Sequence, residues 1–289
     1  MENSLFTGAC TAMVTPFING KVNYPMAEVL LRRQIDAGIP AVVLSGTTGE
    51  SATLTDDEKT ELFRRCKEYA GSSCKIIAGT GSNSTEHAVQ LSKDAEQAGV
   101  DALLVVSPYY NKATPDGLYA HYLSISHAVN VPIILYNVPG RTGLDIPVSV
   151  YERLSRIPNI IGVKEASNDI TKITRIRRQC PPEFTIWSGN DDQIVPVMAL
   201  GGSGVISVIS NLIPKEVNAM CQAISVGDIQ KASHLQCQIQ PIVDLMFCEV
   251  NPIPVKEAMK LIGFDCGNCR LPLSRLSAAN QEKLAKFFS

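Results

Sequence analysis

The sequence of 289 residues has little net charge and no long apolar run. Its 26 Lys and Arg residues nearly balance 28 Asp and Glu residues, which gives a formal net charge of −2 at pH 7. Proteins that bind nucleic acid or an anionic membrane usually carry a marked basic excess, so neither is an expected partner. No uncharged apolar stretch reaches the roughly 20 residues that a transmembrane helix needs.

Signals for secretion and for disulfide bonding are also weak. Residues 1–17 lack a basic stretch followed by a continuous apolar one, so we expect a cytoplasmic protein. Nine scattered cysteines, an odd number, favour reduced thiols over a disulfide framework. Cys266 and Cys269, in "CGNC", have the spacing of a metal or redox pair, but no second pair of metal ligands accompanies them. We interpret them as incidental loop thiols, and the sequence assigns them no role.

No metal or organic cofactor is expected from the motifs. The four histidines show no metal-ligand spacing; they are His87, His121, His127 and His234. The stretch "GTGSNS" (79–84) lacks the third glycine of a dinucleotide-binding fingerprint. The glycines of "GGSG" (201–204) precede a predicted strand, which places them on the wrong face of a barrel to bind a substrate phosphate.

Eight apolar runs of strand length alternate with segments of helical spacing. The runs are residues 8–17, 41–46, 75–81, 101–110, 131–139, 159–167, 184–191 and 204–211. Their continuous hydrophobicity indicates parallel strands that are covered on both faces. Between two of them, Thr55 and Glu58 fit the start of a helix that Gly71 ends. Eight such units predict an α/β fold of the (β/α)8 TIM-barrel type, with a doubly wound open sheet as the alternative.

The pattern changes beyond residue 226. Three helical segments without strands follow, at about 228–248, 254–262 and 277–288. We therefore predict a catalytic barrel over residues 1–226 and a C-terminal helical region over residues 227–289. No low-complexity linker separates the two, so the helical region is expected to pack on the barrel.

Lys164 ends the apolar run that begins at residue 159. The active sites of such barrels lie at the carboxyl ends of the strands, so this lysine is expected at the barrel mouth. Partial desolvation there would lower its pKa, and a neutral amine can form a Schiff base with a carbonyl compound. The alternative is a structural lysine at the rim that pairs with Glu165 or Asp169.

Neighbouring strand ends carry groups that suit a lysine of this kind. The turn "GTTG" (46–49) offers hydroxyls and closely approachable amides for a small carboxylate. Tyr136 leaves the preceding strand, where its phenol could move protons at an imine, although a buried tyrosine bonded to backbone is an equal alternative. Arg141 follows in a Pro/Gly loop and could hold a second carboxylate with two parallel hydrogen bonds.

Seven motifs occur together in order: "GTTGES", "SPYYN", "YNVPGRTG", "GVKEAS", "SGND", "GVISV" and "NPIPVK". With them the chain resembles, over nearly its whole length, the family of dihydrodipicolinate synthases, also called 4-hydroxy-tetrahydrodipicolinate synthases. The resemblance implies a lyase that condenses pyruvate with L-aspartate 4-semialdehyde on the way to diaminopimelate and lysine. It also implies that no metal or organic cofactor takes part.

The resemblance implies catalytic roles for four residues. Lys164 would be the Schiff-base lysine and Tyr136 the proton relay. Thr47 would link Tyr136 to Tyr110, which the family places in the active site of a neighbouring subunit. A homotetramer built as a pair of tight dimers is implied with it.

Substrate-binding roles are implied in the same way. Thr48, with the backbone of its turn, would hold the carboxylate of pyruvate. Arg141 would hold the carboxylate of the semialdehyde. Gly189 and Ile206 would line the pocket through their main chains.

The family also has lysine-sensitive members, which bind lysine at the tight-dimer interface. The matching positions here are Ser51, Ala52, Asp56, Lys59, Asn83, His87 and Tyr109. The sensitive relatives carry a glutamate where this chain has His87 and a histidine where it has Lys59. Loss of a carboxylate and gain of a cation disfavour a bound ammonium group, so we expect weak or no inhibition by lysine.

Two other functions stay open from the sequence. An N-acetylneuraminate lyase or a 2-keto-3-deoxy sugar acid aldolase would share the lysine, the tyrosine and pyruvate. A sugar substrate needs hydroxyl partners in the loop of Arg141, whereas a second small acid needs a cation, so this residue favours the synthase. A catalytically silent barrel that binds a keto acid is the alternative outside enzyme chemistry.

Overall fold

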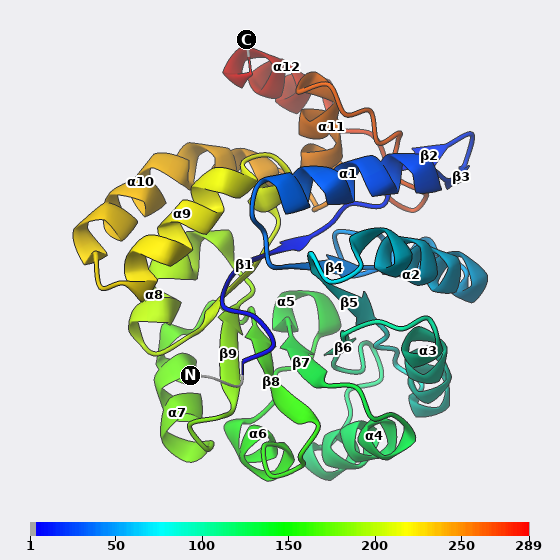
Figure 1. The fold of residues 1–289 in the computed structure, drawn as a ribbon, viewed down its shortest axis with the longest axis vertical. Coiled ribbons are helices and arrows are strands. Elements are labelled where there is room, and N and C mark those ends of the chain that lie inside the picture. The colour runs from blue at the N-terminus through cyan, green and yellow to red at the C-terminus, as the bar shows by residue number, and fades with distance from the viewer. Residues whose placement is uncertain (1–3, 289) are drawn as a thin grey trace.

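The computed structural model describes residues 4–288. The predicted barrel region begins, and the predicted C-terminal region ends, with residues outside this range, namely residues 1–3 and 289. Eight parallel strands form a closed barrel (Figure 1). β1 (Gly8–Ala12) pairs in parallel with both β4 (Ala41–Leu44) and β10 (Gly204–Ser207), which closes the ring. The other barrel strands are β5 (Lys75–Gly79), β6 (Ala102–Val106), β7 (Ile133–Asn137), β8 (Ile160–Glu165) and β9 (Thr185–Ser188). The predicted TIM barrel is confirmed, and the open-sheet alternative is wrong.

Helices connect successive strands and cover the outside of the barrel (Figure 1). They are α1 (Tyr24–Asp36), α2 (Asp56–Ala70), α3 (Thr85–Gln97), α4 (Pro115–Ala128), α5 (Pro139–Thr142), α6 (Val148–Leu154), α7 (Ile170–Gln179), α8 (Ile194–Ala199) and α9 (Pro214–Ser225). Three short 3-10 helices are η1 (Ser51–Thr53), η2 (Asp191–Gln193) and η3 (Ile209–Asn211). The predicted start of α2 is confirmed as a capping box, in which Thr55 and Glu58 each accept a hydrogen bond from the other's backbone N–H.

Two details of the strand prediction are wrong. The first run was predicted as one strand to residue 17, but Phe17–Ile18 (β2) instead pairs with Lys21–Val22 (β3) in a short antiparallel ribbon. The predicted strands also extend past the observed carboxyl ends of β4 to β10. The residues beyond these ends leave the sheet and form the loops of the barrel mouth.

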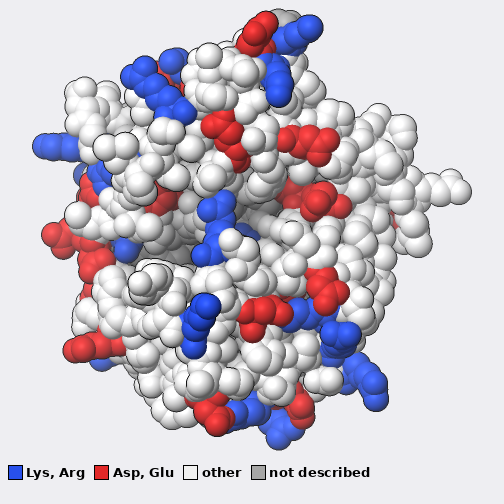
Figure 2. All heavy atoms as spheres, turned by 180° about the vertical axis from the view of Figure 1, so that it is seen from behind, with Lys and Arg blue, Asp and Glu red and all other residues white. Residues whose placement is uncertain are grey.

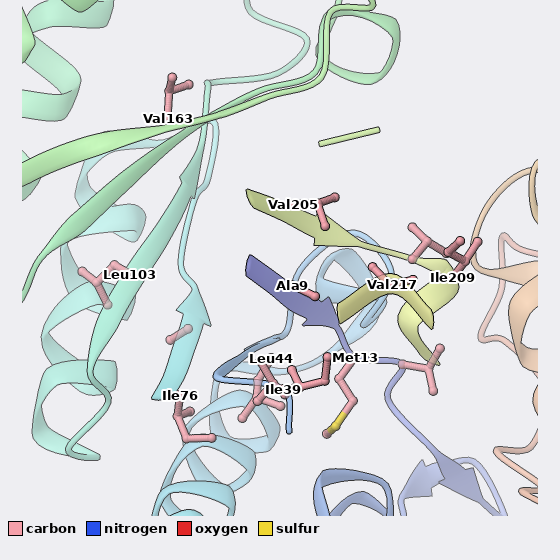
Figure 3. Packing of buried hydrophobic residues seen from close by; sticks show 14 of the residues in the cluster. Ala9, Met13, Ile39, Leu44, Ile76, Leu103, Val163, Val205, Ile209 and Val217 are labelled. Atoms are coloured by element: carbon pink, nitrogen blue, oxygen red, sulfur yellow. The ribbon is translucent and has the colours of Figure 1, made fainter. Parts of the chain in front are cut away.

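The apolar residues of the strands form two layers. Side chains such as Ile77, Ile134 and Trp187 fill the inside of the barrel. Those of the opposite face, among them Leu103 and Val163 in Figure 3, belong to the larger cluster between the strands and the helices. Burial on both faces explains why the runs in the sequence are continuously apolar.

The C-terminal helices are α10 (Ile229–Met246), α11 (Ile253–Leu261) and α12 (Ala278–Phe287), close to the predicted segments. α10 packs against α9 and α8, α11 contacts η3, and α12 contacts α11 and lies farthest from the barrel in Figure 1. The predicted boundary at residues 226 and 227 falls between α9 and α10 and stays a prediction. Between residues 4 and 288, no helix combines the length and apolar character needed to cross a bilayer.

A buried ion pair joins α11 to the barrel mouth. Lys256 Nζ donates to Glu50 at 2.8 Å and to the backbone oxygens of Thr15 at 3.1 Å and Asn268 at 3.3 Å. The second carboxylate oxygen of Glu50 accepts the backbone N–H of Arg270 at 2.8 Å. Only 3% of the Lys256 side chain and 1% of the Glu50 side chain are exposed. Each charge is therefore stable in this position only while the other is present.

We expect Lys256→Met to lower the free energy of unfolding by about 3–5 kcal/mol, because it leaves the Glu50 carboxylate buried without a cation. Adding Glu50→Gln should recover part of the loss. Lys260→Met, on an exposed position of the same helix, is the matched control and should change little. Urea unfolding of the four proteins measures this; equal effects at Lys256 and Lys260 would contradict it.

His121 on α4 is a second buried polar group. Its Nδ1 lies 2.9 Å from Thr85 Oγ1 on α3, and its Nε2 has no hydrogen-bond partner in the described chain. Burial lowers the pKa of His121 from 6.5 to about 4. The folded protein therefore resists protonation that the unfolded chain accepts, and stability is lost as pH falls from about 6.5 toward 4.

His121→Gln should remove this pH dependence. Between pH 7.5 and pH 5 the wild type is expected to lose about 2 kcal/mol more of its free energy of unfolding than the variant. Urea unfolding of both proteins at the two pH values gives the comparison. Parallel losses in the two proteins would show that other groups set the pH dependence.

Candidate active site

Residues at the carboxyl ends of β4, β5, β6 and β7 open into a cavity of about 440 Å³. Thr47, Tyr136, Arg141 and Asn251 are among its lining residues. The face of the molecule in Figure 2 is hollowed near its centre and bears side chains of both charge signs. The cavity lies at the barrel face where enzymes of this fold hold their substrates.

Lys164, on β8, is buried with 5% of its surface exposed. Its Nζ lies 4.5 Å from the centre of the Tyr136 ring. Within residues 4–288 it makes no hydrogen bond and no ion pair, so the alternative of a rim lysine paired with Glu165 or Asp169 is wrong. A buried amine without a carboxylate partner is free to react with a carbonyl compound.

Glu165, the next residue, belongs to a network on the outer face of the barrel. Its carboxylate accepts hydrogen bonds from Asn137 Nδ2 at 2.8 Å and from Tyr151 at 3.0 Å, and it lies 3.7 Å from Lys172 Nζ. Burial, together with the Glu165 charge, raises the pKa of Tyr151 well above its usual value. Successive strand side chains point to opposite faces, so this network holds Lys164 toward the barrel interior.

Tyr136 and Lys164 are direct neighbours across the β7–β8 pair. The Tyr136 hydroxyl makes no hydrogen bond to backbone in the part of the chain that the structure describes, so that alternative is wrong. The Thr47 hydroxyl also has no partner there. Tyr110 is 89% exposed and does not line the cavity, so one chain by itself does not bring Tyr110 to Tyr136.

Gly189 gives the lysine side chain room. A Cβ at this position would lie 2.5 Å from Ala166 Cβ and 3.2 Å from Lys164 Cε. Ile206 belongs to the inward-facing cluster that also contains Tyr136. The cavity lining itself includes neither of these two residues nor Lys164.

Asn251 is a site residue that the sequence analysis missed. Its Nδ2 donates to Thr48 Oγ1 at 3.0 Å, and its backbone oxygen accepts from an Arg141 guanidinium nitrogen at 3.1 Å. It thus connects the two predicted carboxylate-binding residues. The available signal was the motif "NPIPVK", which begins at Asn251, but nothing local assigns it a partner 203 positions away.

Most of the predicted lysine-binding residues line the same cavity. They are Ser51, Ala52, Asp56, Lys59, His87 and Tyr109. Asn83 does not line it, and its backbone oxygen instead accepts from Asn111.

The charged members of that group already pair with one another. Asp56 lies 2.9 Å from His87 Nε2 and 3.4 Å from Lys59 Nζ, and His87 Nδ1 lies 3.1 Å from Ser82 Oγ. Burial raises the pKa of Asp56, but the hydrogen bonds from His87 and Lys59 outweigh it, and the net shift is downward. The carboxylate is therefore engaged before any ligand arrives.

Cys266 and Cys269 are both free thiols. Burial raises the pKa of each to about 12, so neither is a reactive thiolate near neutral pH. Over residues 4–288, no three His, Cys, Asp or Glu side chains are arranged to hold a metal ion.

Comparison with known proteins gives one consistent family. The sequence profile of the Dihydrodipicolinate synthetase family matches residues 5–289. A 4-hydroxy-tetrahydrodipicolinate synthase from Thermoanaerobacter sp. is 46% identical over 99% of this chain and 96% of its own length. The crystal structure of dihydrodipicolinate synthase from Thermotoga maritima is 40% identical and has a TM-score of 0.96 over 99% of this chain and 98% of that one.

A second solved structure was determined with lysine bound. It is the enzyme from Cyanidioschyzon merolae, 40% identical, with a TM-score of 0.94 over 97% of this chain and 96% of that one.

Proposed function

The chain belongs to the dihydrodipicolinate synthetase family, and from this premise we propose that it condenses pyruvate with L-aspartate 4-semialdehyde to 4-hydroxy-tetrahydrodipicolinate. This is a lyase step of lysine and diaminopimelate biosynthesis. The observation that carries the proposal is the buried, unpaired Lys164 against the Tyr136 ring, next to a cavity that Arg141 lines.

The chemistry begins at Lys164. Its neutral amine attacks C2 of pyruvate, and loss of the carbonyl oxygen as water leaves an iminium ion. Loss of a proton from C3 gives an enamine, whose C3 forms a carbon–carbon bond to the aldehyde carbon of the second substrate. The amino group of that substrate then attacks C2 and displaces the lysine, which closes the ring and frees the enzyme.

Other residues bind the substrates and move protons. Tyr136, beside Lys164, supplies and removes protons during formation of the imine, and Thr47 connects its hydroxyl to Tyr110. Thr48 and the amides of its turn hold the pyruvate carboxylate. Arg141 holds the carboxylate of the semialdehyde through a charge-assisted hydrogen bond.

The working form is a cytoplasmic homotetramer made of two tight dimers. Tyr110 supports the dimer, because its side chain is 89% exposed in the loop after β6, and its backbone holds a left-handed conformation with φ of 75° while its N–H donates to Thr142. A neighbouring subunit would bring such a tyrosine to Thr47 and complete the proton path.

Borohydride trapping tests the function. Reduction in the presence of pyruvate should add one reduced adduct per chain, which peptide mass spectrometry finds at Lys164. Lys164→Arg should abolish trapping and lower turnover by orders of magnitude, because a guanidinium stays protonated. Lys260→Arg is the exposed control. Adducts at another lysine, or none in the wild type, would refute the mechanism.

Regulation by lysine is expected to be weak. The cavity that would receive the ligand contains Lys59 and His87, and Asp56 is already bonded to both. The ammonium group of a bound lysine would have to displace these contacts. It would then approach Lys59 and His87 instead of a free carboxylate.

Millimolar L-lysine should therefore leave most of the wild-type activity intact in the assay with pyruvate and aspartate semialdehyde. The double variant His87→Glu with Lys59→His restores a carboxylate and should increase sensitivity severalfold. Strong inhibition of the wild type at sub-millimolar lysine would contradict this expectation.

A further inference from the structure

The Asn137 side chain closes the base of the loop that carries Arg141, here called the Arg141 loop (residues 138–145). The loop follows β7 directly, forms the short helix α5 and returns to the end of β7. On its return, the backbone N–H of Ile146 donates to Asn137 Oδ1 at 3.0 Å, and Asp145 Oδ1 accepts from Asn137 Nδ2 at 2.7 Å. Asn137 is fully buried, so water does not compete for these hydrogen bonds.

The same amide group is bonded to the strand of the reactive lysine. Asn137 Nδ2 also donates to Glu165 Oε1 at 2.8 Å. These two residues form the cross-strand pair that follows the pair of Tyr136 and Lys164. Because successive strand side chains point to opposite faces, the amide contact lies outside the barrel while the reactive pair points inward. Asn137 therefore connects the Arg141 loop to the residue next to Lys164.

The position of the Arg141 guanidinium group depends on this loop. Arg141 is an exposed residue, and a long side chain of this kind has many rotamers. Its guanidinium group donates to the backbone oxygen of Asn251 at 3.1 Å, a contact that holds the end of the side chain but not the base of the loop. A shift of about 1 Å in a group that positions a substrate can lower a rate by up to ~100-fold.

We infer that Asn137 is a positioning residue that holds the Arg141 loop at a set place relative to Lys164. This inference rests on the proposed function, in which Arg141 binds the carboxylate of the semialdehyde and Lys164 binds pyruvate. A carbon–carbon bond joins the two substrates, so the groups that bind them have to stand at a matching distance. Asn137 sets this distance from outside the barrel and is not among the residues that line the cavity.

Loss of the Asn137 amide group should affect the loop more than the lysine strand. Glu165 keeps the hydrogen bonds that it accepts from Tyr151 at 3.0 Å and from the backbone N–H of Ser167 at 2.9 Å. The backbone N–H of Ile146, by contrast, loses its acceptor at a buried residue, which is unfavourable. The reaction of the lysine with pyruvate should therefore persist while use of the semialdehyde declines.

The test combines Asn137→Ala with Arg141→Ala. Alone, Asn137→Ala should lower kcat/KM for L-aspartate 4-semialdehyde about tenfold and change the rate of borohydride trapping of pyruvate less than about threefold. In the Arg141→Ala protein the same substitution should lower kcat/KM less than about threefold, because the group that it displaces is already absent. A substitution that only weakens the fold would act equally in both backgrounds.

Asn159→Ala is the matched control. Asn159 directly precedes β8, at the end of the strand away from Lys164. Its Nδ2 donates to the backbone oxygens of Ser126 at 3.0 Å and Val129 at 3.1 Å, and its Oδ1 accepts from Ser126 Oγ at 2.6 Å. It therefore makes as many side-chain hydrogen bonds as Asn137, and its loss should lower stability but leave kcat/KM and trapping within about threefold.

Three results would overturn the inference: no loss of kcat/KM in Asn137→Ala, the same loss in the Arg141→Ala background, or the same loss in Asn159→Ala. If Asn137→Ala does not fold, Asp145→Leu breaks the contact from the other side, and Asp145→Asn keeps an oxygen acceptor. A loss confined to Asp145→Leu supports the inference, and equal effects of the two overturn it.

Borohydride trapping separates this inference from the proposed function. No adduct of pyruvate at Lys164 in the wild type refutes the proposed function. Normal trapping in the wild type, with equal losses of kcat/KM from Asn137→Ala in both backgrounds, refutes only the role of Asn137.

Discussion

The buried ion pair between Glu50 and Lys256 is the contact on which the barrel mouth depends. Glu50 directly follows "GTTG" and has a left-handed backbone conformation, with φ of 56°. Its hydrogen bond with Lys256 anchors the side chain where the turn ends. Desolvating two charges is costly, and here the cost is offset by their mutual contact and by hydrogen bonds from or to the backbone. Helix α11 is thus part of the site, since removing it would leave a bare carboxylate beside the substrate-binding turn.

The same physical principle operates at the end of β8, with the opposite result for the lysine. Strand alternation sends Lys164 into the barrel and Glu165 to the outer face. Asn137, Tyr151 and Lys172 satisfy Glu165 there, so its charge is not available to Lys164. Lys164 therefore stays unpaired although a glutamate is its neighbour in the sequence. Schiff-base chemistry needs such an unpaired buried amine.

Substrate choice depends on the loops above this lysine. A sugar acid would need hydroxyl partners, whereas the cavity presents Arg141, whose guanidinium group donates a hydrogen bond to the backbone oxygen of Asn251. A cation at this place suits a second carboxylate, which favours the semialdehyde over the sugar substrates of related lyases. A silent barrel that binds only a keto acid would have no use for this second cationic group.

The barrel, the capping box at the start of α2 and the position of Lys164 at a strand end could be predicted from the sequence. These follow from local patterns: continuous apolar runs, the Thr55 and Glu58 capping box, and a charged residue at a strand end. The ribbon of β2 and β3, the strand ends, and the contacts of Asn251 and Lys256 came only from the tertiary structure. Asn251 meets Thr48 across 203 positions and Lys256 meets Glu50 across 206. Such partners become neighbours only after the barrel closes and α11 packs on its mouth, and no spacing rule along the chain encodes that.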